Sequence, residues 1–207
     1  MIELDTVNLD NFDEMIEGIN SSIDQASQMA VNSSARYGHS LIKEGILNRV
    51  NLTSAYIGST TSGKLRVIPT SKGSRGVARI QGRQRATMLH RFLIGKVVKG
   101  SSPRVSVKKS GASKTMTNAF EIRLANGNMG LVVRVKGDVD KLKNSRGAVK
   151  IKNKRGKSKS TSSLFLMYAP SISQIMSSMI TKERVIQTKI EERLREEFTR
   201  QLLRLSS

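Results

Sequence analysis

Residues 119–135 read AFEIRLANGNMGLVVRV, and this stretch carries the clearest β-sheet signal in the chain. Apolar and charged residues alternate from Phe120 to Leu124, which is typical of a strand with one buried face. Asn126 and Gly127 come next, and a second apolar run begins at Leu131. Asn-Gly between two apolar-patterned runs is the strongest short-range signal for a β-hairpin. The sequence therefore predicts an antiparallel hairpin at the centre of the fold.

Shorter β signals precede the hairpin. Residues 64–69 and 77–81 alternate polar or basic with apolar side chains and predict two strands, with Gly73 and Gly76 between them. Residues 86–93 fit either a short helix or an irregular strand. These segments together predict a small antiparallel sheet or partial barrel that contains the hairpin.

A long amphipathic helix is predicted at the N-terminal side, over residues 11–47. Its apolar residues recur at spacings of three and four, and they are Phe12, Ile16, Ile19, Ile23, Ala26, Ala30, Tyr37 and Leu41. The stripe is thin and is surrounded by Ser, Asn and Ala, so we expect the helix to need partners. Asn51 is a candidate cap for a short second helix over residues 52–57.

A long C-terminal helix is also predicted. Ser171 and Gln174 form a capping-box pair directly after Pro170. If the helix is continuous from 172 to 205, its length is about 50 Å at about 1.5 Å per residue. A rod of that length exceeds what a small core can cover, so we expect it to contact other subunits. The candidate interface residues recur every fourth position and are Ile186, Ile190, Leu194, Phe198 and Leu202.

The expected fold class is therefore α+β, with a long N-terminal helix, a small antiparallel sheet and a long C-terminal helix. Three segments are predicted: a helical arm (1–63), a basic β-rich core (64–168) and the C-terminal helix (169–207). Apolar residues make up 37% of the chain and aromatic residues 4%. Both values predict a modest core.

The charge is concentrated in the middle of the chain. Residues 64–160 contain 26 Lys and Arg but only three acidic residues, whereas residues 1–63 have a net charge of −5 and residues 161–207 of +2. A positive charge of this size favours polyanionic partners, either nucleic acid or an acidic protein surface.

Within that basic middle, residues 137–160 combine positive charge with Gly, Ser and Asn, and we predict a mobile loop there. The candidate contacts to a polyanion or an acidic partner are Lys141, Lys143, Arg146, Lys150, Lys152, Lys154, Arg155, Lys157 and Lys159. One interpretation is a solvated surface, or one complementary to an acidic neighbour in an assembly. The other is contact with phosphates, which would be salt-sensitive and independent of nucleotide sequence because no base-reading motif is present.

Several functional classes are disfavoured. The chain has no cysteine and only two histidines, His39 and His90, which excludes thiol catalysis, cysteine-ligated zinc and a multi-His metal site. The basic middle lacks the clustered carboxylates that metal-dependent phosphoryl chemistry needs. No apolar run approaches the roughly 20 residues of a membrane span, and the acidic N-terminus lacks a signal-peptide pattern. We expect no enzyme activity, no cofactor, no metal and no membrane partner.

Four motifs, taken in their order along the chain, resemble the minor tail protein Z family of long-tailed bacteriophages, also called tail completion or neck proteins. They are NSSAR (32–36), QGRQRATMLHRF (81–92), NAF (118–120) leading to GLVVR (130–134), and LMYAPSISQI (166–175). The family tends to have Gly and Pro where this chain has Ala169 and Ser173. The basic stretch 137–160 resembles an insertion relative to the family.

The resemblance implies a structural virion protein that completes the head-proximal end of the tail and helps to join tail to head. It implies a ring of copies, with six expected from tail symmetry, assembled in the host cytoplasm and located in the tail or neck of the virion. The implied partners are the tail terminator, the tail tube or the head-tail connector, and the end of the packaged DNA. The alternative from the residues alone is a basic protein that binds nucleic acid without sequence preference.

Overall fold

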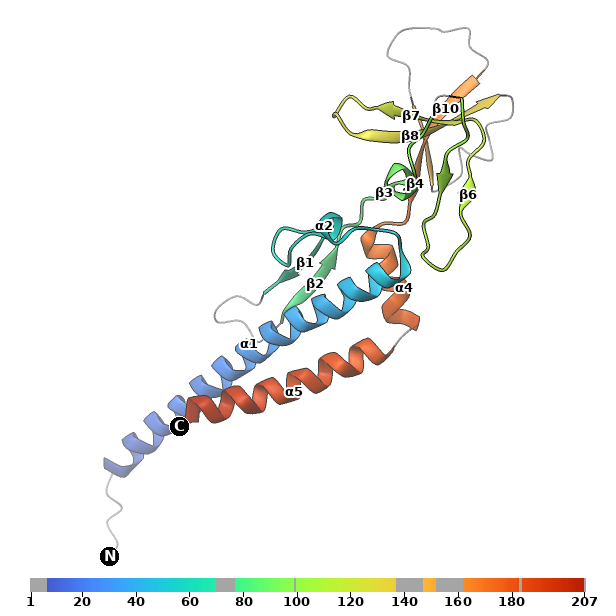
Figure 1. Cartoon of the computed structure of the whole chain (residues 1–207). Coiled ribbons are helices and arrows are strands. Elements are labelled where there is room, and N and C mark those ends of the chain that lie inside the picture. Colours follow the sequence, from blue (N-terminus) through green and yellow to red (C-terminus); the bar gives the residue numbers. More distant parts are fainter. Residues whose placement is uncertain are drawn as a thin grey trace, which may run out of the picture. The chain divides into compact units, whose positions relative to one another are not determined.

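The computed structural model describes residues 7–69, 77–98, 100–136, 147–151, 162–182 and 184–206 (Figure 1). The architecture is α+β, as predicted, with long helices and antiparallel sheets. The chain groups into two compact units. The first unit comprises residues 1–42, 59–81 and 179–207, and the second comprises residues 43–58 and 82–178. Each unit draws on more than one of the three segments predicted from sequence.

The first unit is built on α1 (Val7–Arg49), which belongs to it as far as Ile42, and on α5 (Arg184–Ser206). The long N-terminal helix is thus confirmed, and Ala26 and Ala30 of the predicted stripe are buried, but its isoleucines are not. Ile16, Ile19 and Ile23 are 39–48% exposed. From Ala26 onward the buried positions recur every fourth residue as Ala26, Ala30, Ser34, Gly38 and Ile42, and Ala35 and His39 are buried beside them.

Small residues on that face let α5 approach α1 closely. A Cβ atom on Gly38 would lie 2.7 Å from Cδ1 of Ile190. Further along, the Arg204 guanidinium donates to the Met29 sulfur at 3.7 Å. Because Gly38 meets Ile190 and Met29 meets Arg204, the two helices run antiparallel. The apolar periodicity was correct at Ala26 and Ala30 but wrong for the large side chains before them, because the part of α1 that packs closely presents small residues.

The remaining elements of the first unit are β1 (Leu65–Ile68) and β2 (Arg79–Gly82, of which Gly82 belongs to the second unit). They form a two-stranded sheet, which confirms the two predicted strands. The carbonyl oxygen of Leu65 lies 3.1 Å from Nε2 of His39, which is 3% exposed. His39 therefore ties α1 to β1.

The second unit contains the predicted hairpin, formed by β7 (Ala119–Arg123) and β8 (Met129–Lys136). Phe120 is paired with Val132, and Gly127 adopts a φ of 79° in the turn. The hairpin belongs to a curled five-stranded antiparallel sheet of order β3-β10-β8-β7, in which β9 (Ala148–Lys150) also pairs with β10 (Ser162–Ala169). The core of this unit is centred on Leu131, Val132 and Phe165, each fully or almost fully buried.

Residues 86–93, predicted as a helix or an irregular strand, form both kinds of structure. Strand β3 (Thr87–Met88) is followed by a 3-10 helix, η1 (Leu89–Phe92), and then by β4 (Leu93–Ile94). Strand β4 begins a three-stranded sheet with β5 (Arg104–Val105) and β6 (Lys114–Thr115).

The short second helix exists as α2 (Ser54–Ile57), but the predicted cap is wrong. Thr53 is the N-cap, and its hydroxyl accepts from the Tyr56 amide at 3.3 Å. The Asn51 side chain instead donates to the Ser106 carbonyl at 3.0 Å.

The C-terminal helical segment begins with the predicted capping box. The Gln174 amide donates to Ser171 Oγ at 3.1 Å, and the Ser171 amide donates to Gln174 Oε1 at 2.9 Å. Two helices follow, α4 (Ile172–Lys182) and α5 (Arg184–Ser206). The long C-terminal helix is thus confirmed in α5, whereas the described residues divide the predicted 172–205 rod into two elements.

Candidate interaction surfaces

The described residues offer no metal centre and no membrane span. Among them, no group of three or more His, Asp or Glu side chains is placed to hold a metal ion. No helix in the same residues is both long and apolar enough to cross a bilayer. His90 lies with Nδ1 2.7 Å from Oε1 of Glu121, and both side chains are about one-quarter exposed. This contact joins η1 to β7. Each of the two histidines therefore contacts a residue of another element, His39 the Leu65 carbonyl of β1 and His90 the Glu121 carboxylate of β7.

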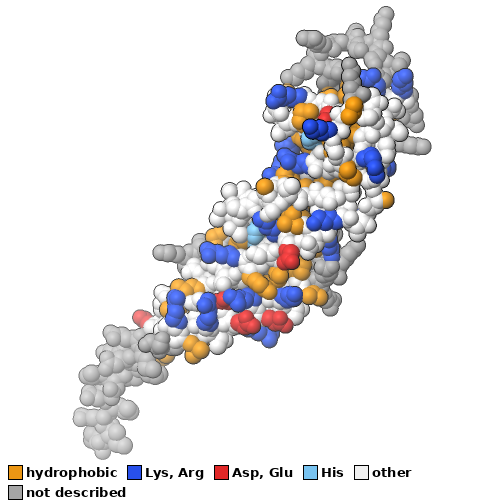
Figure 2. All heavy atoms as spheres, viewed as in Figure 1, with side chains coloured by type: hydrophobic (Ala, Val, Ile, Leu, Met, Phe, Trp, Pro, Cys, Tyr) orange, Lys and Arg blue, Asp and Glu red, His pale blue; other side chains and the backbone are white. Residues whose placement is uncertain are grey.

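The two units differ strongly in charge. The sequence of the second unit contains 23 Lys and Arg against four Asp and Glu, a net of +19. The sequence of the first unit contains 13 basic and 12 acidic residues, a net of +1. Figure 2 shows blue Lys and Arg side chains over the visible face, with red acidic side chains gathered mainly over the helices. The electrostatic attraction for polyanions therefore belongs mostly to the second unit.

Most basic side chains described in the second unit point to solvent. The exposed ones are Arg83, Arg85, Arg91, Lys96, Arg104, Lys108, Lys109, Lys114, Arg123, Arg134, Lys136 and Lys150. Two of them also lie over aromatic rings. The Arg91 guanidinium is 4.3 Å from the centre of the Tyr56 ring, and that of Arg134 is 5.5 Å from the centre of the Phe120 ring. Such stacking fixes the position of the cation while leaving it accessible.

Of the nine predicted polyanion contacts, the described residues include only Lys150. It is exposed at the end of β9, opposite Phe165 of β10. The other eight lie outside the described residues and stay predictions: Lys141, Lys143, Arg146, Lys152, Lys154, Arg155, Lys157 and Lys159. The predicted mobile loop at 137–160 falls mostly in the same part of the chain. The sequence prediction did not include the exposed cations on β5, β6, β7 and β8.

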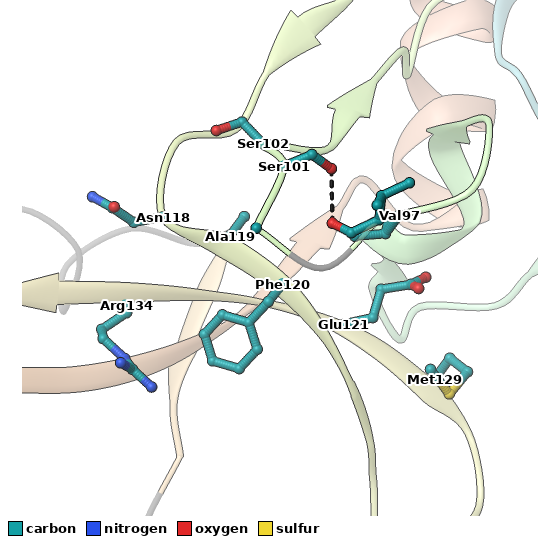
Figure 3. Close-up of a pocket in the computed structure, with 11 residues that line it drawn as sticks. Val97, Ser101, Ser102, Asn118, Ala119, Phe120, Glu121, Met129 and Arg134 are labelled. Atoms are coloured by element: carbon teal, nitrogen blue, oxygen red, sulfur yellow. Dashed lines mark hydrogen bonds between the residues drawn. The ribbon is translucent and has the colours of Figure 1, made fainter.

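A cavity of about 740 Å³ opens beside the hairpin (Figure 3). Its apolar lining comes from Val97, Val98, Phe120 and Met129, and Arg134 lines it beside Phe120. The Ser101 hydroxyl donates to the Val98 carbonyl at 2.8 Å, which holds one wall of the cavity. We call this feature the hairpin groove. Its lining combines these apolar side chains with the polar Ser101, Ser102 and Asn118, the acidic Glu121 and the exposed cation of Arg134.

Asn118, at the entry to β7, also lines the groove. Its φ is 56°, the only positive value among the described non-glycine residues. Its carbonyl accepts from the Arg134 amide at 2.9 Å. Asn tolerates this left-handed conformation better than most residues, so the strand entry is fixed without a glycine.

The five candidate interface residues on α5 do not form one exposed face. Ile186 is 9% exposed, and Ile190 packs against Gly38 of α1 within the same chain. Leu194, Phe198 and Leu202 are half-buried. Part of the predicted stripe is therefore already used inside the first unit, and the assignment of the stripe to a subunit interface stays a prediction.

A buried carboxylate on α5 is not among the functional residues predicted from the sequence. Glu197 is 2% exposed. It forms ion pairs with Arg193 at 2.5 Å and with Arg200 at 2.5 Å. The hydrogen bond from Arg200 lowers the pKa of Glu197 below its usual value against the opposing effect of burial, and the Arg193 charge lowers it further.

The signal for this cluster was present in the sequence. Arg193 and Arg200 stand four residues before and three residues after Glu197, which are the spacings that place side chains together on a helix. Arg193 also lies with its guanidinium 5.9 Å from the centre of the Tyr37 ring on α1. The cluster of Arg193, Glu197 and Arg200 therefore links α5 to α1 through the contact between the Arg193 guanidinium and the Tyr37 ring.

Comparison of this chain with protein-family models, with curated proteins and with solved structures found no match in any of the three.

Proposed function

We propose that this chain is a structural protein of a bacteriophage virion, acting as a ring at the head-proximal end of the tail and helping to join tail to head. The basis is the ordered set of four motifs that resembles the minor tail protein Z family. The proposed partners are further copies of the chain and neck or tail proteins such as a tail terminator, a tail tube or a head-tail connector.

The observation that carries the proposal is the meeting of three motif segments in one unit. Residues 82–92 of the second motif, the hairpin of the third and the fourth motif (166–175) all lie in the second unit, whereas Gln81 and the first motif (32–36) belong to the first unit. Thr87 is paired with Ala169 across β3 and β10, and the Ser173 amide donates to the Arg83 carbonyl at 3.1 Å. Leu166 is paired with Val132 of the hairpin. Motifs far apart in sequence that pack together are expected of a fold core that a family shares.

The proposed mechanism is assembly without catalysis. A ring requires heterologous contacts that close, so each copy must present two different and complementary surfaces. The basic second unit offers one surface, for an acidic protein neighbour or for the end of the packaged DNA. The helices of the first unit offer another, with a nearly balanced charge.

The test uses the parent phage with this gene disrupted and then complemented. We expect electron microscopy of the disrupted lysate to show filled heads and separate tails that do not join, and complementation to restore joined particles. Normal infectious particles from the disrupted phage would contradict the proposal.

A second candidate function is sequence-independent binding of nucleic acid, and the +19 charge of the second unit favours it. Its test is duplex binding by the purified chain over a range of salt concentrations. A nucleic-acid-binding role predicts a steep linear fall of log K with log salt that is the same for unrelated duplexes. Replacing Lys108 and Lys109 with Gln should reduce that slope by roughly 1 to 2. Replacing Lys189 and Arg195 of α5 with Gln is the matched control and should leave the slope unchanged.

A further inference from the structure

The first part of α1 combines negative charge with an exposed apolar stripe. Residues 1–35 contain seven Asp and Glu and not a single Lys or Arg. On α1, Ile16, Ile19 and Ile23 are 40%, 48% and 39% exposed. Their spacings of three and four place them on one helix face, and Glu17 and Asp24 are exposed beside them. We call the stretch 16–24 the acidic stripe.

Within the first unit, α5 does not cover the acidic stripe. Its last turn contacts α1 at Met29 through Arg204, and the buried face of α1 begins at Ala26 among the side chains that the structure describes. Ile19 lies seven residues before Ala26, about 10 Å along the helix axis at about 1.5 Å per residue. An amphipathic helix gains most of its stability from packing its apolar face, so this face is suited to a partner.

The hairpin groove in the second unit has the complementary properties. Val98 and Met129 in its lining are 65% and 39% exposed. Arg134 supplies an exposed positive charge at its wall, while the acidic residue of the lining, Glu121, already faces His90. A helix laid in a groove uses side chains spaced three and four apart as its anchors, and this is the spacing of the three isoleucines.

We propose that the acidic stripe of one copy docks in the hairpin groove of a second copy of this chain. The isoleucines would enter the apolar lining, and Glu17 and Asp24 would lie toward the basic surface around Arg134. Each copy carries both surfaces, so the contact is heterologous and repeats from copy to copy, which produces a closed ring or a filament. The inference deepens the proposed ring function and rests on it only for ring closure.

The absence of cysteine in the chain makes a direct test possible. Two single variants, Ile19→Cys and Val98→Cys, are purified separately, mixed and oxidised, so that any bond between positions 19 and 98 joins two copies. Docking raises the effective concentration of the two thiols. We expect at least about tenfold more crosslinked dimer from the mixture than from either variant alone.

The matched control replaces Ile19→Cys by Val185→Cys, a position on α5 that is 61% exposed and so no less accessible than Ile19, which is 48% exposed. This control pair should give only the background yield of random collisions. If the 19–98 mixture gives the same yield as the control pair, the docking contact is overturned. All three substituted side chains are exposed, so the variants are expected to fold.

A second measurement follows self-association of the intact chain by sedimentation velocity. Ile19→Asp places a charge in the proposed apolar contact and should weaken self-association at least about tenfold, a loss of about 1.4 kcal/mol. Val185→Asp should leave it unchanged. A wild-type chain that stays monomeric, or equal effects of the two variants, would overturn the inference. Failure here together with a head-tail joining defect in the disrupted phage would leave the proposed function standing without this contact.

Discussion

Gly82 is a single position where two segments far apart in the sequence touch through their backbones. A Cβ atom at this position would lie 2.9 Å from both the Cα and the amide nitrogen of Ser173 at the start of α4. Backbone atoms cannot rotate away as a side chain can. Gly82→Ala should therefore lower the free energy of unfolding by about 1–3 kcal/mol, as overpacking usually does, measured by urea unfolding of the intact chain.

Gly18 provides the matched control for Gly82. A Cβ atom at Gly18 would meet nothing within 4 Å, and the position lies inside α1. Because Ala is preferred to Gly in a helix by roughly 1 kcal/mol, Gly18→Ala should leave the stability unchanged or raise it. A Gly82→Ala variant as stable as Gly18→Ala would mean that α4 and the segment before β3 can separate without cost.

Glu197 is the second residue with a specific expected effect. Glu197→Gln removes a charge that pairs with Arg193 and Arg200 and should cost about 1–2 kcal/mol near neutral pH. Because its pKa is lowered in the folded state, the stabilisation is complete above the unfolded pKa of about 4.3 and is lost as pH falls through the folded value. The stability difference between wild type and Glu197→Gln should therefore shrink in acid, as followed by urea unfolding across that pH range.

Glu196→Gln is the control for this prediction. Its side chain is 69% exposed and 3.6 Å from Arg193, a surface pair that contributes little. Its effect should stay below about 0.5 kcal/mol at every pH. A pH-independent loss for Glu197→Gln would indicate that shape, and not charge, accounts for its role.

At the start of α5, the two adjacent residues Val185 and Ile186 face different surroundings. Ile186 is 9% exposed and Val185 is 61% exposed. Ile186→Asp would bury an unpaired charge and should lower the free energy of unfolding by about 3 kcal/mol or more. Val185→Asp, one position earlier, should change it by less than about 0.5 kcal/mol. Thermal and urea unfolding of the two variants test whether the start of α5 is core or interface.

The elements themselves were largely predictable from local pattern. The hairpin, the two strands of the first unit, α1, α2 and the capping box of α4 all carry short-range signals that depend on neighbouring residues only. Which face of α1 is buried was not predictable from local pattern in the same way. Its buried face is set by small residues opposite Ile190, and only the position of α5 decides that Gly38 faces inward.

The candidate site was less predictable than the elements. The hairpin groove joins residues 97–102 to 118–134, and no local pattern brings these segments together. The buried Glu197 was hidden because charge on a helix is usually solvated, although its flanking arginines have pairing spacing. Of the nine predicted cation contacts, only Lys150 lies among the described residues.

For the whole molecule, the decisive property is the unequal distribution of charge. The second unit carries a net charge of +19, whereas residues 1–35, which belong to the first unit, carry −7. A chain with opposite charges in different parts attracts copies of itself as well as foreign polyanions. Nucleic acid would therefore compete with self-association for the same basic surface, and self-association must be measured on protein freed of nucleic acid.

This charge distribution predicts how assembly responds to salt. The screening length falls from about 10 Å at about 0.1 M salt to about 3 Å at about 1 M. If the acidic stripe docks in the hairpin groove, raising NaCl over that range should weaken self-association by about tenfold or more in sedimentation velocity. If the apolar stripe of α5 formed the interface instead, raising NaCl would strengthen self-association or leave it unchanged. The self-association of the Ile19→Asp variant is already weak, and added salt should not weaken it further, because the contact in which the charges act is already lost. A wild-type assembly that strengthens with salt would place the interface on apolar surface and away from the acidic stripe.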